Sequence, residues 1–488
     1  MNTSRPLRRC ASIVLATLAL GLHAADTPPA PPPPPPSDVL PEDVQVECVE
    51  FARLDPKLAR SGDTRVSRDF TRVATRETVE GGKRVVVDGV AGPVYASLYA
   101  LDFAPAGARY AYEVRTPDRQ YSVVVDGEAG PLFDAADDLV WSADGNHYAY
   151  RARRAEDGAW AVVRDGVVGA FAPGRISRLA LSPDGAHLAV LREDENGKAR
   201  VATYEGQPLA EQATGFAYSP FKWSADGSTF AYVAERMKGD ATERYLVVNG
   251  EERGAGTSID TDYLVLSADG RHFAANISQG SGREIVVHDG RVLGPYQTLW
   301  GKPTLSADGT RIAFVATLDD GFAHAVIDGT PGPAATNRHG VKLLRFSADG
   351  RVVGYLRQTG ENLWALHVGD RTLGEPADFK ELWLSPDGSR VAVQVKTAAG
   401  LQIVVDGNAT EPFFRDIAPE GTQFTSDGRD FLYLATRDRK TFTMRVAGRG
   451  GRTYQLAAPL FRFDGPARFT FVSCTDGVFS RETWTLPR

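Results

Sequence analysis

The sequence predicts an all-β fold: a β-propeller built from about ten to eleven four-stranded repeats of ~40 residues, as one large ring or two tandem rings. Three observations predict it. A Ser-x-Asp-Gly tetrapeptide returns at intervals of 38 to 43 residues. A short apolar strand pattern centred on a small residue follows almost every copy, and a second Asp-Gly turn comes roughly fifteen residues later.

The first recurrent turn connects two strands of each predicted repeat. Gly tolerates the positive φ that tight hairpin turns demand, and Asp can bond to the backbone of its own turn, so both residues have a structural explanation. We assign this role in the repeat to Asp144, Gly145, Asp184, Gly185, Asp226, Gly227, Asp269, Gly270, Asp308, Gly309, Asp349, Gly350, Asp387, Gly388, Asp427 and Gly428.

Two further patterns mark the remaining strands. Tyr-Ala-Tyr at residues 148–150 and Ile-Ala-Phe at 312–314 are β-type patterns with a small central residue. Val-Val-Val-Asp-Gly at 123–127 ends in the second turn, and Gly130-Pro131 then suits an outer strand, because Pro lacks an N–H group. Each unit therefore predicts four antiparallel strands with two apolar faces, which radial stacking of the units would cover.

The repeats resemble the TolB-type propeller family, whose units carry a Ser-Pro-Asp-Gly turn before a strand of the type apolar-Ala-aromatic. Residues 182–185 and 385–388 match this turn fully, whereas most copies have Ala in place of Pro, as at 142–145. The recurrent Val-Val-Asp-Gly is an addition that suggests a distinct subgroup. The resemblance covers roughly residues 60 to 475. It implies a periplasmic location and a protein partner in the cell envelope, but no particular reaction.

The N-terminal region predicts export. Residues 1–25 read as a signal peptide, with Arg5, Arg8 and Arg9 before an apolar stretch at 11–22 that is too short to span a bilayer. A proline-rich linker follows at 26–41, as a spacer or as a docking peptide, and the repeat region occupies 42–488, possibly as two propellers. We expect the protein to be periplasmic or secreted.

Composition and charge narrow the partners. The 488 residues are 24% charged and 42% hydrophobic, as in ordinary globular proteins. Loss of three arginines with the signal peptide leaves 52 basic and 62 acidic residues, a net charge of about −10. Nucleic acid is therefore a poor candidate partner. We expect no membrane span and a monomer.

Two cysteines lie beyond the signal peptide, at opposite ends of the chain. The last repeat lacks an obvious outer strand, and we expect residues 44–51 to supply it and Cys48 to form a disulfide with Cys474. The alternative is two separately buried thiols.

Catalytic signatures are missing from the sequence: it has no Gly-x-Ser-x-Gly, His-Glu-x-x-His, Cys-x-x-Cys or phosphate loop. One repeat position alternates between His and Arg, which favours a polar site at a strand start over a metal cluster; it holds His147, His187, His272, Arg109, Arg311 and Arg390. Paired carboxylates can perform acid–base chemistry, and two groups occur near repeat junctions, Asp134, Asp137 and Asp138, and Asp260 and Asp262. We nevertheless expect no catalytic residue, no cofactor and no metal.

Two functions from different classes fit these observations. The first is an exported propeller scaffold without catalytic activity that binds a protein or a cell-envelope component. The alternative is a saccharide- or peptide-binding or processing enzyme with its site at the central channel. The two are distinguished by whether the channel collects non-repeating charged residues, such as an acidic pair near an Arg.

Overall fold

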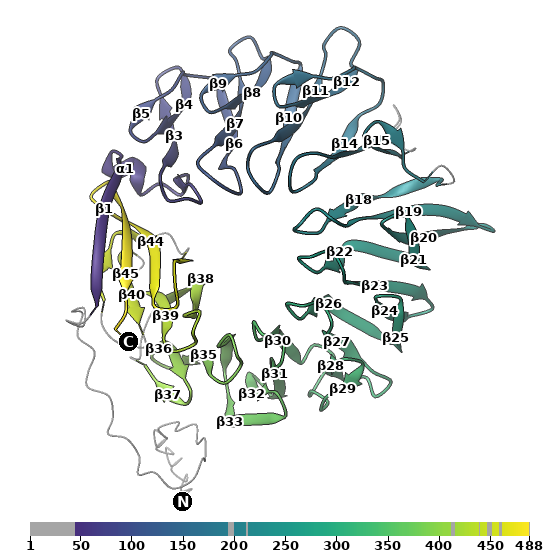
Figure 1. Ribbon diagram of the computed structural model, residues 1–488, viewed down its shortest axis with the longest axis vertical. Coiled ribbons are helices and arrows are strands. Elements are labelled where there is room, and N and C mark those ends of the chain that lie inside the picture. The colour runs from purple at the N-terminus through teal and green to yellow at the C-terminus, as the bar shows by residue number, and fades with distance from the viewer. Residues whose placement is uncertain are drawn as a thin grey trace, which may run out of the picture.

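The computed structural model describes residues 44–193, 200–210, 213–410, 415–438, 440–446, 451–457 and 461–487. The expected signal peptide and most of the proline-rich linker lie outside these residues. Within them, the strands form eleven antiparallel sheets, which confirms the predicted β-propeller of about ten to eleven repeats. The sheets follow one another in chain order as the blades of one ring (Figure 1).

The strands of blades 1 to 10 pair in chain order, starting from the inner side of the ring. Blade 1 is β2 (Arg65–Val66), β3 (Val73–Val79), β4 (Gly82–Val87) and β5 (Val90–Ala91). Blade 2 is β6 (Ser97–Phe103), β7 (Tyr110–Arg115), β8 (Tyr121–Val125) and β9 (Glu128–Ala129). Blade 3 is β10 (Ala135–Trp141), β11 (Tyr148–Arg153), β12 (Trp160–Arg164) and β13 (Val167–Val168). Blade 4 is β14 (Ile176–Leu181), β15 (Leu188–Glu193), β16 (Arg200–Tyr204) and β17 (Gln207–Pro208).

The next blades repeat this plan. Blade 5 is β18 (Gly215–Trp223), β19 (Phe230–Lys238), β20 (Ala241–Val248) and β21 (Glu251–Gly256). Blade 6 is β22 (Ser258–Leu266), β23 (Phe273–Gly280), β24 (Arg283–His288) and β25 (Arg291–Tyr296). Blade 7 is β26 (Thr298–Leu305), β27 (Ile312–Thr317), β28 (Ala323–Ile327) and β29 (Thr330–Pro331). Blade 8 is β30 (Val341–Phe346), β31 (Val353–Gly360), β32 (Leu363–Val368) and β33 (Arg371–Ala377). Blade 9 is β34 (Phe379–Leu384), β35 (Val391–Thr397), β36 (Gly400–Val405) and β37 (Asn408–Ala409), and blade 10 is β38 (Asp416–Phe424), β39 (Phe431–Thr436), β40 (Phe442–Val446) and β41 (Thr453–Tyr454).

Blade 11 joins the two ends of the described chain. It contains β42 (Leu456–Ala457), β43 (Arg462–Phe463), β44 (Arg468–Thr475) and β45 (Val478–Thr485), and β1 (Gln45–Arg53) is its outermost strand. β1 runs antiparallel to β45, with Gln45 opposite Thr485 and Arg53 opposite Val478. The short helix α1 (Pro56–Ala59) then leads to blade 1. The expected outer strand at residues 44–51 is therefore confirmed.

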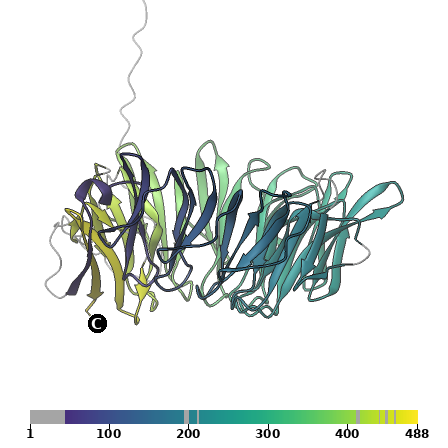
Figure 2. The same cartoon turned by 90° about the horizontal axis from the view of Figure 1, so that it is seen from above.

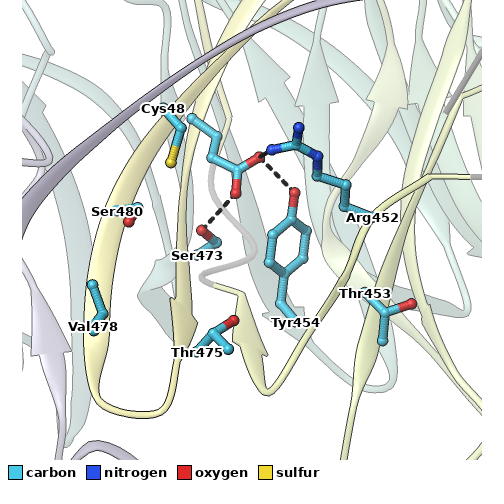
Figure 3. Close-up of a pocket in the computed structure, with 9 residues that line it drawn as sticks. Cys48, Arg452, Thr453, Tyr454, Ser473, Thr475, Val478 and Ser480 are labelled. Carbon is cyan, nitrogen blue, oxygen red and sulfur yellow. Dashed lines mark hydrogen bonds and ion pairs between the residues drawn. The ribbon is translucent and has the colours of Figure 1, made fainter. Parts of the chain in front are cut away.

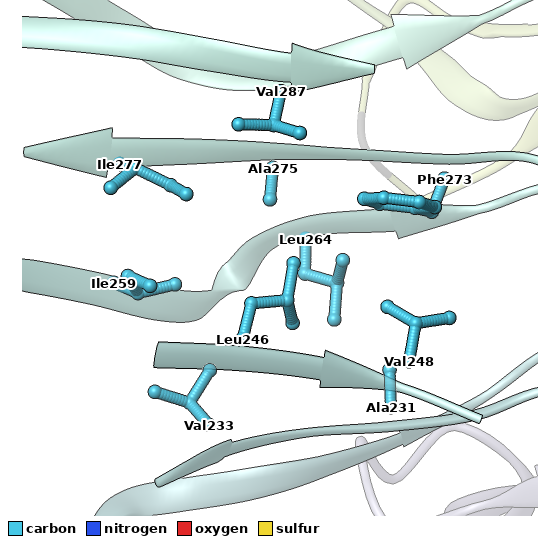
Figure 4. Packing of buried hydrophobic residues seen from close by; sticks show 10 residues of the cluster. All are labelled: Ala231, Val233, Leu246, Val248, Ile259, Leu264, Phe273, Ala275, Ile277 and Val287. Atoms are coloured by element: carbon cyan, nitrogen blue, oxygen red, sulfur yellow. The ribbon is translucent and has the colours of Figure 1, made fainter. Parts of the chain in front are cut away.

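The core lies between neighbouring blades. In the cluster between blades 5 and 6, Ala231 and Leu246 of blade 5 belong to the same buried group as Ile259, Phe273 and Ile277 of blade 6 (Figure 4). Ala231 occupies the small central position of the strand pattern. A small residue there leaves room for the larger side chains of the next blade, because interiors are close-packed. This packing explains the recurrent Ala in the second strand.

Each blade has two different ends. The first and second Asp-Gly turns lie at one end, which we call the turn face, because the four-stranded meander places its first and third connections together. Figure 2 shows the ring from the side, with loops at both ends of the blades. The opposite end, which we call the hairpin face, carries the turns between second and third strands and the connections to the next blade. No helix in the described residues is long and apolar enough to span a membrane.

Candidate functional site

The predicted Ser-x-Asp-Gly turns form a repeated hydrogen-bond unit. In blade 4, the Ser182 hydroxyl donates to an oxygen of Asp184 at 2.6 Å, and the backbone N–H of His187 donates to the Ser182 oxygen at 2.9 Å. The same carboxylate accepts from the backbone of Ala186 at 3.0 Å. These contacts lower the pKa of Asp184, with the bond from Ser182 as the first cause. The eight predicted turn glycines, from Gly145 to Gly428, have φ between 66 and 74°.

The position that alternates between His and Arg joins these turns to each other. In blade 7, Arg311 Nε donates to Asp328 of the second Asp-Gly turn at 2.9 Å, and the backbone of Ile312 donates to the other oxygen of that carboxylate at 3.0 Å. Arg311 also donates to the backbone oxygen of Arg351, in the first turn of blade 8, at 2.7 Å. His147 contacts Asp165 at 2.9 Å in the same way. Internal bonds therefore occupy much of the turn face.

A second set of polar side chains links blades near the inner strands. Glu113 and Arg151 hold the same position in β7 and β11. Glu113 accepts backbone hydrogen bonds from Asp138 and Leu139 of blade 3, and Arg151 donates to the backbone oxygen of Ile176 in blade 4 at 2.7 Å. Burial, together with the nearby charge of Asp137, raises the pKa of Glu113 to about 7. This group can therefore exchange a proton near neutral pH.

Two of the predicted carboxylates meet this cluster. Arg151 contacts Asp137 at 2.5 Å and Asp138 at 3.8 Å. Asp134 instead pairs with Arg153 at the edge of blade 3. In blade 6, Asp260 and Asp262 are both exposed, and the backbone of Asp262 donates to Asp260 at 2.9 Å. The acidic pair beside an Arg is thus present at Asp137 and Asp138, on an inner strand.

The inner side of the ring also carries a basic pocket. Its volume is about 460 Å³, and its lining includes Lys222, Lys302 and the first turns of blades 6 and 7. Lys222 donates to the backbone oxygen of Leu264 at 2.5 Å. Burial lowers the pKa of Lys222, and the charge of Lys302 lowers it further. Non-repeating charges of both signs therefore occur on inner strands.

A pocket of about 540 Å³ lies between blades 10 and 11, where β1 closes the ring (Figure 3). Glu482 of β45 is its central group and is only 3% exposed. Its carboxylate accepts hydrogen bonds from Tyr454 at 2.6 Å, Ser473 at 2.9 Å and Trp484 at 3.0 Å. Arg452 lies 3.9 Å away. The buried carboxylate thus accepts three hydrogen bonds, which compensate for its burial. Burial is the main cause that raises the pKa of Tyr454, and the charge of Glu482 raises it further.

Sequence reasoning missed this pocket. Its residues come from β1, β41, β44 and β45, which lie at opposite ends of the chain. The signal available was a Glu at position 482, two residues before the apolar Trp484 in a strand that must bury one face.

The expected disulfide is wrong. Both cysteines of the described chain are free, Cys48 exposed and Cys474 buried. Cys48 lies opposite Glu482 in β45, whereas Cys474 lies opposite Phe479 in β44–β45 pairing. The two residues are therefore on strands separated by β45, offset along the sheet and on opposite faces of it. A disulfide requires Cα atoms about 4.4–6.8 Å apart and Cβ atoms that face each other, which this arrangement does not allow.

One group in the described residues brings three possible metal donors together. Donor atoms of His272, His288 and Asp289 all lie within 4.8 Å of one another in blade 6. The sequence-based expectation of no metal site compared equivalent positions in different blades. It did not consider that two different positions of one blade, those of His272 and His288, could meet.

Comparison with known proteins finds distant structural similarities. No protein-family model and no curated protein matches the chain. A eukaryotic initiation factor is similar at 13% sequence identity and a TM-score of 0.37, covering 84% of this chain and 97% of that chain. The β-propeller domain of the Trilobed protease from Pyrococcus furiosus, described as having an open velcro topology, is similar at 14% identity and a TM-score of 0.28, covering 57% and 94%. At these scores, the assignment to the β-propellers rests on the strand pairing of the chain itself.

Proposed function

We propose that this protein is an exported ring scaffold that binds a protein of the cell envelope through its hairpin face, without catalysis of its own. The observation that carries the proposal is a set of exposed apolar side chains at the hairpins of four blades: Val201, Met237, Phe322 and Leu363. Met237 is 54% exposed and Phe322 41%. Exposed apolar side chains can form the centre of a protein interaction site, and the exposed Val90, Val167 and Val292 of the turn face provide the comparison for this face.

The charged residues around these hairpins support an apolar contact. Arg236 is paired with Glu243 at 2.8 Å and with Glu252 at 2.7 Å, and Arg283 with Asp319 at 2.8 Å. Charges that are already paired and exposed contribute little to the affinity for a partner. We therefore expect a partner that presents an apolar segment, and the resemblance to TolB-type propellers supports the periplasm as the place of contact.

Capture followed by a direct binding measurement tests the proposal. Two baits are cross-linked in envelope extract: the mature chain, residues 26–488, and a chain that lacks residues 26–37. A protein that both baits recover is then purified. Its affinity is then measured for the triple variant M237S/F322S/L363S. The matched control is V90S/V167S/V292S, which removes three residues that are 73%, 72% and 59% exposed beside second Asp-Gly turns.

The hairpin variant should bind about tenfold more weakly or worse, because interface cores carry most binding energy, and the control should bind normally. Equal affinity of the two variants contradicts the proposed face. Loss of capture with the shortened bait moves the contact to the proline-rich segment.

The inner-strand charges favour a second function, a saccharide- or peptide-processing enzyme. Glu113 has a pKa near neutral pH, the charge of Asp137 acts on it, and Arg151 pairs with Asp137, as a general acid–base site would require. Against it, Glu113 and Arg151 both make backbone bonds to the next blade, which is a structural role. If neither bait captures a protein, a screen of envelope saccharides and peptides with wild type and Glu113→Gln decides between these roles.

A further inference from the structure

Blade 6 differs from most other blades at the residue before its second Asp-Gly turn. That position is Val87, Val125, Val248 and Val405 in four other blades, and it packs in the apolar cores there. Blade 6 has His288 instead, with its side chain only 10% exposed. A buried imidazole in an aliphatic position requires polar partners.

Two of the groups near His288 can also bind a metal ion, His272 and Asp289. His272 Nδ1 lies 2.7 Å from Asp289 Oδ2, and His288 Nε2 lies 3.5 Å from the same oxygen. In a tetrahedral zinc site, bonds of about 2.0–2.1 Å place neighbouring donors roughly 3.3 Å apart. The donor atoms of His272 and His288 lie within 4.8 Å of each other, so this pair must close by about 1.5 Å at most to surround one ion. The second oxygen of Asp289 accepts from the backbone of Phe273 at 2.9 Å, which fixes the orientation of the carboxylate.

We propose that His272, His288 and Asp289 form a binding site for a divalent transition metal ion of the zinc class. Two imidazoles and one carboxylate are the donors that Zn²⁺ prefers, whereas Ca²⁺ and Mg²⁺ prefer an all-oxygen set. The side chains of His272 and Asp289 are 26% and 35% exposed, so an ion can enter from solvent and keep water as a further ligand.

The next blade holds this site in shape. The ring of His272 lies against Gly309 of the first turn of blade 7, where an added Cβ would come within 2.6 Å of the His272 side chain. His288 Nε2 also lies 3.1 Å from the backbone oxygen of Gly309. A bound ion would compete with that hydrogen bond. The competing interpretation is that His288 only joins the blades.

Blade 3 provides a natural control for this distinction. His147 contacts Asp165 at 2.9 Å, as His272 contacts Asp289, but Arg164 replaces the second imidazole. Arg164 donates to the backbone oxygens of Gly185 and Ala186 in blade 4. It thereby joins the blades without offering a metal donor, and its positive charge opposes a cation.

Zinc titration of the untagged mature protein tests the proposal. Protein with Cys48→Ser, which removes the exposed thiol, is stripped with chelator, and Zn²⁺ is added in a calorimeter at pH 7.5. We expect one tight equivalent in this background, and binding at least about tenfold weaker in His288→Val, since loss of a ligand exceeds the outer-shell effect. The control His147→Val should leave the stoichiometry unchanged. Both substitutions have precedent in the repeat, at Val248 and Val352.

Co²⁺ provides a second measurement, because its visible spectrum reports directly which donors surround the bound ion and in what geometry. The tetrahedral band should be present with His147→Val and lost with His288→Val. Absence of a tight equivalent in the parent protein, or equal binding by His288→Val, overturns the proposal. Arg164→His gives blade 3 the same three donors: a second equivalent supports the assignment, and an unchanged count contradicts the claim that these donors suffice.

Discussion

Replacement of Glu113 by Gln should make the stability of the ring less dependent on pH. The fold raises the pKa of this carboxyl from 4.5 to about 7, chiefly by burial and then by the charge of Asp137. The fold therefore favours the protonated form. The stability gained from proton binding is fully present below pH 4.5 and is lost as the pH rises through 7. At about 1.4 kcal/mol for each factor of ten, the ionised form costs the folded state about 3 kcal/mol at most.

Urea unfolding at pH 5 and pH 8, followed by tryptophan fluorescence, measures this cost. Gln resembles the protonated Glu and retains a carbonyl oxygen for the N–H groups of Asp138 and Leu139, so E113Q should lose less unfolding free energy than wild type between the two pH values. The difference between the two proteins should be about 2.5 kcal/mol, because the unfolded carboxyl is already partly ionised at pH 5. The control E80Q changes an exposed carboxylate in a hairpin turn and should behave as wild type. Equal pH dependence of wild type and E113Q would refute the reasoning.

Three further predictions concern thiols, turns and ring closure. One thiol of the native mature protein should react rapidly with Ellman's reagent, and C48S should abolish this reaction, because Cys474 is buried and its pKa is raised. A disulfide-linked Cys48–Cys474 peptide in a non-reduced digest would contradict the prediction of two free thiols. G309A should lower the melting temperature more than G107A: both glycines have φ near 70° and incur about 1–2 kcal/mol of backbone strain, but only Gly309 also meets a neighbouring side chain. E482A should cost about 3–5 kcal/mol of unfolding free energy, because it leaves three buried donors unpaired. An ordinary hydrogen bond contributes about 1 kcal/mol, so a loss below about 1 kcal/mol would show that water replaces the carboxylate.

The fold was predictable because its determinants are local and repeated. The turn at Ser182 and Asp184 makes its bonds within six residues, so the same letters recur in almost every blade. The small residue at Ala231 recurs because each blade meets the next at that point. The outer strand at 44–51 was also predictable, since the last repeat lacked one. What the pattern did not contain was the pairing register, which places Cys48 opposite Glu482 and away from Cys474.

The candidate sites were less predictable, because each combines residues that the repeat does not relate. Glu113 and Asp137 are far apart in the sequence, and they come together only because blade 2 packs on blade 3. The carboxylates at Asp137 and Asp138 were recognised as a possible acid–base group, but the Glu that shares the site was not. His272 and His288 belong to two different repeat positions, and comparison of one position at a time could not join them.

The connections between blades suggest where function can reside in such a ring. Arg311 bonds to the turn of blade 8 and Glu113 to the inner strand of blade 3, so each blade is held by its immediate neighbours. Stability of this kind is a sum of neighbour terms, and a change in one blade has a local cost. A single blade can therefore replace a repeat residue without loss of the ring. The polar departures Glu113, His288 and Glu482 have that local cost, and ionisable groups in such surroundings are candidates for binding or chemistry.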